Sequence, residues 1–338
     1  NIGGDFYYKK TTDLFTNVDV SPINGITSYI MNNGDMLNKG FSISLNGYPV
    51  KTKNFRWYMS TYYSVNLNKV QTDDARNYNL NDYLNGTAVV SGQPISTFYS
   101  YKFLGLNPQN GAPMFDDWED RWHLLQGKTL DEVVPMILVN SGTRDPKFSG
   151  DLNNTFTYKN WSLSLNFSYS LGSKVRLFEM YGPIINGISA AANVREEFLD
   201  RWQVPGDEKY TVYPSIISPS SPDYEHYRLH YSAPQRAVGP NSGVPAFANN
   251  VWQMYDDSDL RVVSGNYLKL QSLSFSYRLN DRLLRKTPFT QLSISFNTHN
   301  CFTISAKELR GQDPSQAGFA DAGLSIRPSY TIGLNVSF

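Results

Sequence analysis

Strict alternation of apolar and small polar residues constrains this chain more than any other feature. In 161–172, apolar residues occupy every second position from Trp161 to Leu171, and the positions between them are serine or asparagine. The segment 329–338 repeats the pattern, with apolar side chains at every even position from Tyr330 to Phe338. Side chains alternate across a β-strand, so each segment has one apolar face and one small polar face. Such strands fit a sheet with an apolar environment on one side and a polar environment on the other.

Six further segments carry the alternation in shorter or weaker form, which gives eight predicted strands. The six are 4–14, the stretch from Phe41 to Leu45, 55–67, 148–158, 273–279 and 292–296. Each of the eight has roughly the length that a tilted strand needs to cross a bilayer. We expect short helices within 117–134 and 196–202. The strand-like segment 96–106 is assigned to a loop, because one extra crossing would break the order of the connections.

Connections between the predicted strands alternate between long and short. The short ones lie near 49–54, 159–160 and 280–288, and the long ones cover roughly 15–39, 69–146, 173–264 and 303–328. Outer-membrane barrels show this asymmetry, with tight periplasmic turns and long extracellular loops. An even strand count then places Phe338 at the periplasmic side. The predicted fold is all-β, an antiparallel transmembrane β-barrel with long extracellular loops.

Composition agrees with this fold and excludes some functions. Serine, threonine, asparagine and glycine dominate the polar face, which suits a water-filled or plugged lumen better than a dry core. Lys plus Arg and Asp plus Glu both number 30, so no net charge favours nucleic acid. Cys301 is the single cysteine, which excludes an internal disulfide. A large soluble β-sandwich, a surface β-protein and a passive porin remain alternatives.

Several segments, taken in order, resemble one family. The resemblance is carried by "MLNKGFSISLNGYPVKTKNFRWYMSTYYSVNLNKV", "YKFLGLNPQNGAPMF", "PKFSGDLNNTFTYKNWSLSLNFSYSLGSKV", "RWQVPGDEKYTVYP", "SGNYLKLQSLSFSYRLNDRL", "LRGQDPS" and the terminal "GLNVSF". This ordered set resembles the C-terminal barrel of SusC/RagA-type TonB-dependent transporters. It spans almost the whole chain and is weakest in the long loops.

The resemblance implies an outer-membrane transporter of Bacteroidota with a 22-stranded barrel, of which 1–338 would supply about eight strands at the C-terminal part. It implies a SusD-like surface lipoprotein as a lid, coupling to TonB with ExbB and ExbD, and a dimer of such pairs in the lipid of the outer membrane. Oligosaccharide import is the expected function, with peptide import as the alternative. The plug domain and the TonB box are absent from 1–338, so we expect the chain to begin within a longer protein. Phe338 resembles the aromatic signal for barrel assembly.

Aromatic residues in the predicted extracellular loops are the candidate substrate-binding residues. Flat aromatic faces stack on sugar rings, and the same faces suit a peptide. The alternative is that they pack the loops together or face a lid protein. The candidates are Trp118, Trp122, Trp202, Trp252, Tyr224, Tyr227, Tyr231 and Tyr255.

Metal and catalytic patterns are weak, and we expect no enzyme, no cofactor and no metal. His226 and His230 have the spacing of one helix face, but no clear third ligand accompanies them. The acidic run Asp116, Asp117, Glu119 and Asp120 lacks the spacing and the glycine of an EF-hand loop, so solvated loop charge is the expected role. His299 with its serine neighbours forms no recognisable triad.

Overall fold

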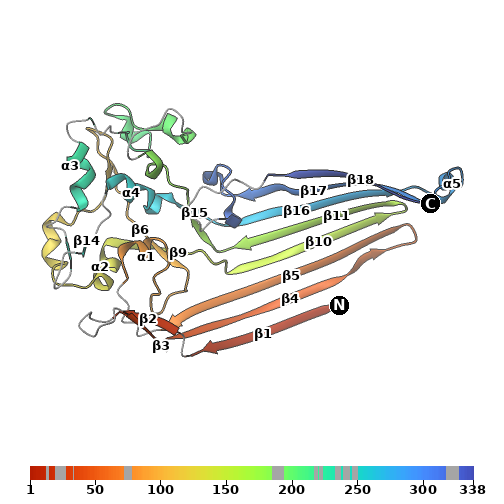
Figure 1. Ribbon diagram of the computed structural model, residues 1–338, viewed down its shortest axis with the longest axis horizontal. Coiled ribbons are helices and arrows are strands. Elements are labelled where there is room, and N and C mark those ends of the chain that lie inside the picture. The colour runs from red at the N-terminus through yellow and green to blue at the C-terminus, as the bar shows by residue number, and fades with distance from the viewer. Residues whose placement is uncertain are drawn as a thin grey trace.

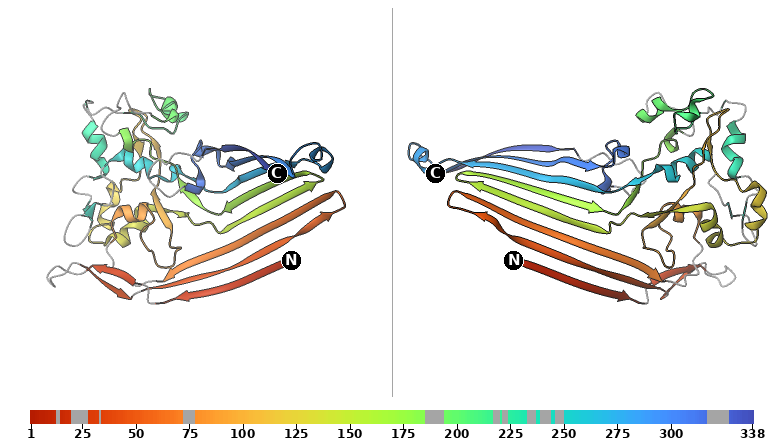
Figure 2. Two further views of the ribbon diagram at one scale, coloured as in Figure 1. Left: turned by 45° about the vertical axis from the view of Figure 1, so that its right-hand side comes forward. Right: turned by 180° about the vertical axis from the view of Figure 1, so that it is seen from behind.

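The structure is a computed structural model that describes residues 1–12, 15–19, 28–32, 34–71, 78–184, 194–216, 220, 224–232, 237–238, 244–245, 250–316 and 327–338. One curved antiparallel sheet of eight strands dominates it (Figures 1 and 2). In sheet order these are β1 (Ile2–Thr11), β4 (Asp35–Lys51), β5 (Phe55–Gln71), β10 (Phe148–Tyr158), β11 (Trp161–Leu171), β16 (Tyr267–Arg278), β17 (Gln291–Ser305) and β18 (Ser329–Ser337). The predicted number of strands and their antiparallel order are confirmed.

Several strand boundaries differ from the prediction: β5 continues to Gln71, β16 begins at Tyr267 and β17 continues to Ser305. β1 covers Ile2–Thr11 instead of 4–14, and β4 begins at Asp35, well before the apolar stretch at Phe41. The polar start of β4 stays in the ladder because it pairs with an equally long β5, for example Asn38 with Asn68. Backbone hydrogen bonds extend a strand beyond the residues whose side chains alternate.

All long connections lie at one end of the sheet, as predicted, and the tight turns lie at the other (Figure 1). Among the described residues, the loop end carries five two-stranded pairs: β2 (Phe15–Asp19) with β3 (Ser28–Asn32), β6 (Thr97–Tyr101) with β9 (Leu138–Thr143), β7 (Gly105–Leu106) with β8 (Pro113–Met114), β12 (Lys174–Arg176) with β15 (Val262–Ser264), and β13 (Ala237–Val238) with β14 (Val244–Pro245). The assignment of 96–106 to a loop is correct, since β6 stays outside the eight-stranded sheet.

Short helices fill the loops, including the two predicted regions. The α-helices there are α1 (Leu80–Leu84), α2 (Leu130–Ile137), α3 (Tyr224–Leu229) and α4 (Val251–Asp256), whereas α5 (Asp281–Leu284) lies in a tight turn. The 3-10 helices are η2 (Glu119–Leu124), η3 (Gly182–Ile184), η4 (Glu196–Asp200), η5 (Asp207–Lys209), η6 (His230–Ser232), η8 (Asp259–Arg261), η9 (Lys307–Leu309) and η10 (Pro314–Gln316). Within the described ranges, no helix is long and apolar enough to cross a membrane.

The two faces of the sheet differ as the alternation predicts. On one face aromatic rings stack across neighbouring strands, as Tyr63 does on Phe148 and Trp161 on Phe275. Many apolar side chains of this face are exposed; Ile332, for example, is 79% exposed. On the opposite face serine and asparagine side chains bond across strands. An exposed apolar surface of this extent is expected to contact lipid.

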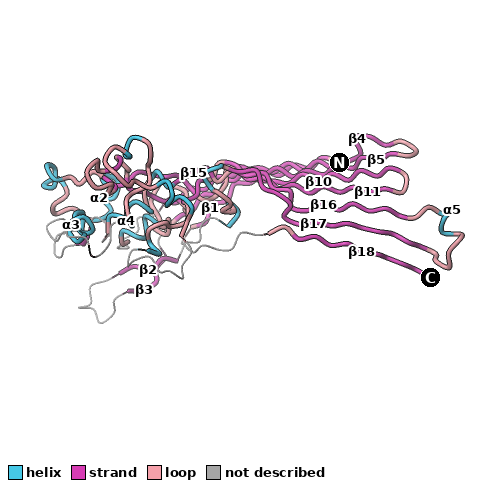
Figure 3. The backbone as a smooth tube through the Cα atoms, turned by 90° about the horizontal axis from the view of Figure 1, so that it is seen from above, coloured by secondary structure: helices cyan, strands magenta, loops and turns pink. Residues whose placement is uncertain are grey.

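The main hydrophobic core lies among the loops and not on the sheet. We call the described residues of 78–146, 173–264 and 306–316 the loop assembly (Figure 3). Arg176, whose side chain is largely buried, joins its parts: the guanidinium donates to the carbonyl oxygens of Leu84 and Tyr99 and pairs with Asp257 at 2.8 Å. Burial raises the pKa of Asp257 to about 6, although Arg176 acts against this shift. The loops therefore form a packed layer with a polar centre.

The family-like segment "LRGQDPS" attaches the last loop to this layer. Leu309 is buried against Val175 and Leu177. The Gln312 side chain accepts a hydrogen bond from the Phe178 amide at 3.0 Å. Asp313 forms a buried ion pair with Lys269 of β16 at 2.9 Å. The segment thus ties the sheet to the loop assembly.

Candidate functional site

A cavity of about 490 Å³ lies inside the loop assembly, between the segment 104–117 and helix α3. We call it the loop cavity. Its lining comes from Leu104, Asn107, Ala112, Pro113, Met114, Phe115, Asp116, Asp117, His226, Tyr227, His230, Tyr231 and Val251. The volume falls within the ~300–1,000 Å³ range of small-molecule sites.

Tyr231 fixes the two sides of the loop cavity to each other. Its hydroxyl oxygen accepts from the Phe115 amide at 2.9 Å and lies 3.2 Å from the Phe115 carbonyl oxygen, to which it donates. The two rings meet edge to face, with centroids 5.8 Å apart. Since 116 positions separate these residues, the contact closes a long loop onto its neighbour.

Carboxylates occupy one wall of the cavity. Asp116 accepts two hydrogen bonds from Arg121, at 2.7 and 2.5 Å, and the Arg121 guanidinium lies over the Trp118 ring. Asp117 lies with its Oδ2 atom 3.2 Å from His230 Nε2. The wall therefore presents hydrogen-bond acceptors close to the half-buried ring of Tyr227.

Most of the predicted binding aromatics are buried in the structure. Trp118, Trp202, Trp252, Tyr224, Tyr231 and Tyr255 are each at most 8% exposed, whereas Trp122 and Tyr227 are half-buried. Tyr224 stacks on Trp252, and Trp202 covers Gly111, where a Cβ atom would lie 2.4 Å from the indole ring. Their packing role matches the alternative that the sequence left open. Tyr227 and Tyr231 line the loop cavity, and substrate contact stays a prediction for the set.

The remaining sequence candidates also have definite places. His226 and His230 lie near each other, with ring centroids 6.1 Å apart. In the part of the chain that the structure describes, no group of three or more His, Cys, Asp or Glu residues could hold a metal ion. The sequence analysis missed Leu104, Asn107 and Met114 as cavity residues. The signal was available in the family-like segment "YKFLGLNPQNGAPMF", which supplies this wall.

Sequence comparison finds similar receptors but no matching family model. The chain is 24% identical over 363 residues to "TonB-dependent receptor P3" of Formosa agariphila, a match that covers 99% of this chain and 32% of the relative. It is 22% identical over 395 residues to "TonB-dependent receptor P39" of the same organism, covering 100% of this chain and 34% of the relative. The chain thus spans about a third of the length of these curated relatives.

Solved structures share the fold along the whole chain. The structure of the RagAB peptide transporter matches with a TM-score of 0.68 at 19% identity, covering 100% of this chain and 33% of that one. RagAB in its 'open-open' state matches with a TM-score of 0.67, also at 19% identity, covering 100% of this chain and 32% of that one. The predicted antiparallel sheet is thereby confirmed, and it has the fold of part of a TonB-dependent receptor barrel. The expectation that the chain is no enzyme is confirmed by the same relatives. The predicted resemblance is therefore confirmed: along its whole length this chain is similar to TonB-dependent receptors of the outer membrane, with the fold of the SusC/RagA type.

Proposed function

We propose that residues 1–338 form part of the barrel wall and the outer loop assembly of a TonB-dependent transporter that imports oligosaccharides. In this proposal they are the C-terminal part of a barrel of about 22 strands, and Phe338 serves as the assembly signal. A SusD-like lipoprotein covers the loop assembly, and TonB with ExbB and ExbD drives import through parts of the protein outside this chain. Two such pairs associate as a dimer.

The loop cavity is the observation that carries the substrate proposal. It combines a tyrosine ring at Tyr227 with the acceptors Asp117 and Asn107, in a volume of about 490 Å³. A sugar ring has an apolar face that stacks on an aromatic ring and hydroxyls that donate to carboxylates. Tyr231 holds the cavity open by its bonds to Phe115, so the site is preformed.

Peptide import is the second candidate function. The solved structures that share this fold are those of RagAB, a peptide transporter or importer. A peptide backbone would donate its N–H groups to the same carboxylates, and its side chains would contact the same tyrosine. Likeness to TonB-dependent receptors favours active import of either substrate over a passive porin.

Binding measurements on the whole receptor with its partner lipoprotein test the proposal. Titration calorimetry with neutral oligosaccharides and with peptides of similar mass identifies the substrate class. Tyr227→Ala or Asp117→Asn should weaken binding about tenfold, equal to about 1.4 kcal/mol. Tyr210→Ala is the matched control, because Tyr210 is a loop tyrosine that is 90% exposed and does not line the loop cavity.

Binding of peptides but not of oligosaccharides would favour peptide import, the second candidate function. If both cavity variants bind with unchanged affinity, the loop cavity does not contribute to substrate binding.

A further inference from the structure

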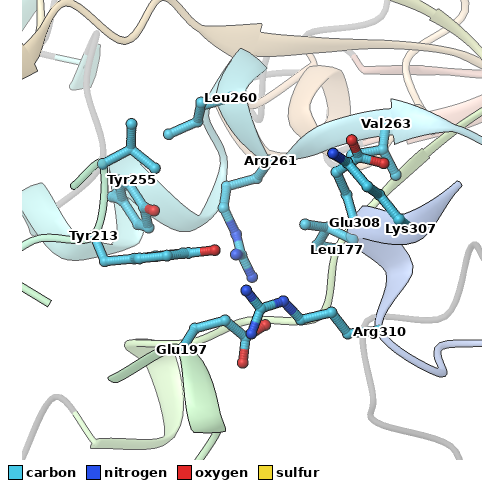
Figure 4. A pocket seen from close by; sticks show the side chains of 11 residues that line it. Leu177, Glu197, Tyr213, Tyr255, Leu260, Arg261, Val263, Lys307, Glu308 and Arg310 are labelled. Atoms are coloured by element: carbon cyan, nitrogen blue, oxygen red, sulfur yellow. The ribbon is translucent and has the colours of Figure 1, made fainter. Parts of the chain in front are cut away.

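A second cavity, of about 400 Å³, lies within the loop assembly and is lined by residues of β15 and η9 (Figure 4). We call it the cationic cavity. One wall of the cavity is aliphatic and consists of Leu177, Leu260 and Val263. The side chains of Arg261 and Arg310 extend toward each other in the cavity. Three cationic side chains and two carboxylates line it, which leaves an excess of one positive charge: Arg261, Arg310 and Lys307 against Glu197 and Glu308.

Arg261 is the unusual residue of the cationic cavity. It is 2% exposed, yet no carboxylate of the described residues forms a salt bridge with it at 4.0 Å or less. Its guanidinium donates to the Phe178 carbonyl oxygen at 2.5 Å and to the Met180 thioether at 3.3 Å, and its Nε has no hydrogen-bond partner among the described residues. A buried guanidinium that makes no direct ion pair is costly, so a carboxylate that reached it would stabilise it.

The nearby acidic groups are already engaged. Asp256 accepts hydrogen bonds from the backbone amides of Met180, Tyr181 and Gly182, at 2.8 to 2.9 Å. Glu197 is held by the guanidinium of Arg195, with its Oε1 at 2.6 and 3.1 Å from two nitrogens. Asp256 and Glu197 therefore act on Arg261 only through longer-range electrostatics, and neither forms a direct ion pair with it.

Tyrosine hydroxyls complete a donor set around the same space. Tyr255 is fully buried, and no residue that the structure describes forms a hydrogen bond with its hydroxyl oxygen. The Tyr213 hydroxyl points toward the Arg261 guanidinium (Figure 4). Arg310 uses one nitrogen for an exposed pair with Glu196, at 3.0 Å, and its guanidinium still lines the cavity. Buried polar groups without partners are rare in proteins, and an absent ion is one of their explanations.

We propose that the cationic cavity binds one carboxylate group of the substrate, with Arg261 as its main ligand. The planar guanidinium matches a carboxylate in a forked pair, and one bound monoanion cancels the excess positive charge. Acidic sugars and the C-terminus of a peptide both carry this group. The biological source of the carboxylate rests on the proposed function, whereas carboxylate binding itself does not.

The test uses the whole receptor in detergent, with small probes. Glucuronate is compared with glucose, and a dipeptide with a free carboxylate is compared with its C-terminal amide. Thermal unfolding and titration calorimetry are the readouts, because a ligand of the folded state raises the unfolding midpoint. We expect a higher midpoint with the carboxylate of at least one pair and no change with its neutral partner. The responding pair identifies the source.

Variants assign the effect to the cavity. Arg261→Met should lower carboxylate affinity at least tenfold, and Arg261→Lys should restore part of it. Arg310→Gln should lower it severalfold, and its side chain is 36% exposed, so folding is preserved if Arg261→Met fails to fold. Arg285→Gln, an exposed arginine beside α5 in the tight turn at the other end of the sheet, is the control and should change nothing.

Equal responses to glucuronate and glucose, and to the free and amidated dipeptide, overturn the proposal. Unchanged carboxylate binding in Arg310→Gln and folded Arg261→Met does the same. If oligosaccharides or peptides bind at the loop cavity while these probes do not bind, this inference fails and the proposed function stands. If the probes bind but no oligosaccharide or peptide does, this inference stands and the proposed function fails.

Discussion

Tyr169 of β11 lies across Gly150 of β10 on the apolar face, and its hydroxyl donates to the Tyr62 carbonyl oxygen at 3.3 Å. The glycine leaves room for this ring. A Cβ atom at position 150 would lie 2.0 Å from the Tyr62 oxygen and 2.4 Å from the Tyr169 hydroxyl. The opposite face repeats the arrangement, where Tyr7 covers Gly40. The glycines are therefore required by close ring packing and not by a turn.

Gly150→Ala should reduce the amount of folded barrel. The added methyl group meets a backbone oxygen that cannot move without breaking the ladder, and overpacking of this kind costs about 1–3 kcal/mol. The folded fraction in outer membranes, measured by heat-modifiable gel mobility of the whole receptor, checks this. Gly47→Ala is the control, since a Cβ atom there meets nothing within 4 Å. Equal folding of both variants would show that the close packing around Gly150 does not contribute to the stability of the barrel.

Leu165→Arg should be more damaging than Asn166→Arg. Leu165 lies on the apolar face, opposite Leu273, whereas Asn166 lies on the polar face, opposite Asn153. A cation that faces the middle of the bilayer costs roughly 2–4 kcal/mol, and a lumen-facing cation stays hydrated. Folded receptor in outer membranes is the measurement. If the two changes reduce it equally, the faces are assigned wrongly.

Asp313→Asn should destabilise the attachment of the last loop at neutral pH. Burial acts to raise the pKa of Asp313, but hydrogen bonds from Ser315 and Lys269 outweigh it, so the pKa lies below its ordinary value. A lowered pKa in the folded state adds stability above the unfolded value, near ~4, and this stability is lost as pH falls below it. The variant leaves Lys269 buried without its partner, at a cost of about 3 kcal/mol.

Urea unfolding of the whole receptor at pH 7 and pH 3 measures this effect. The difference between wild type and Asp313→Asn should be large at pH 7 and small at pH 3. Asp35→Asn removes an exposed pair with Lys10 and should change stability little at either pH. A difference that is independent of pH would contradict a role for the ionised carboxylate.

Phe338→Ala should lower the amount of receptor that reaches the outer membrane. The side chain is 85% exposed and contacts Phe289 edge to face, so its loss changes packing by only a few kcal/mol at most. Surface protease accessibility in cells measures the assembled amount. Phe289→Ala removes the same ring contact but keeps the aromatic at 338, and it should assemble normally. Equal losses in both variants would assign Phe338 to packing instead of assembly.

The strands and their order could be predicted from the sequence because their signals are local. Alternation over 161–172 determines which side chains share a face, and the short connection at 159–160 brings β10 next to β11. The alternation does not show where pairing ends, which is why the polar start of β4 was missed. There the length of the neighbouring strand decides, and that is a property of the sheet.

The site was much less predictable, because its contacts join distant segments. The sequence by itself determined a barrel wall with one lipid face and loops rich in aromatic residues. Only the tertiary structure decided that Tyr231 holds Phe115, that Tyr255 is buried, and that Arg261 forms no salt bridge with a carboxylate of the described residues. Burial and charge compensation depend on which side chains meet in space, and in these loops no sequence periodicity determines that.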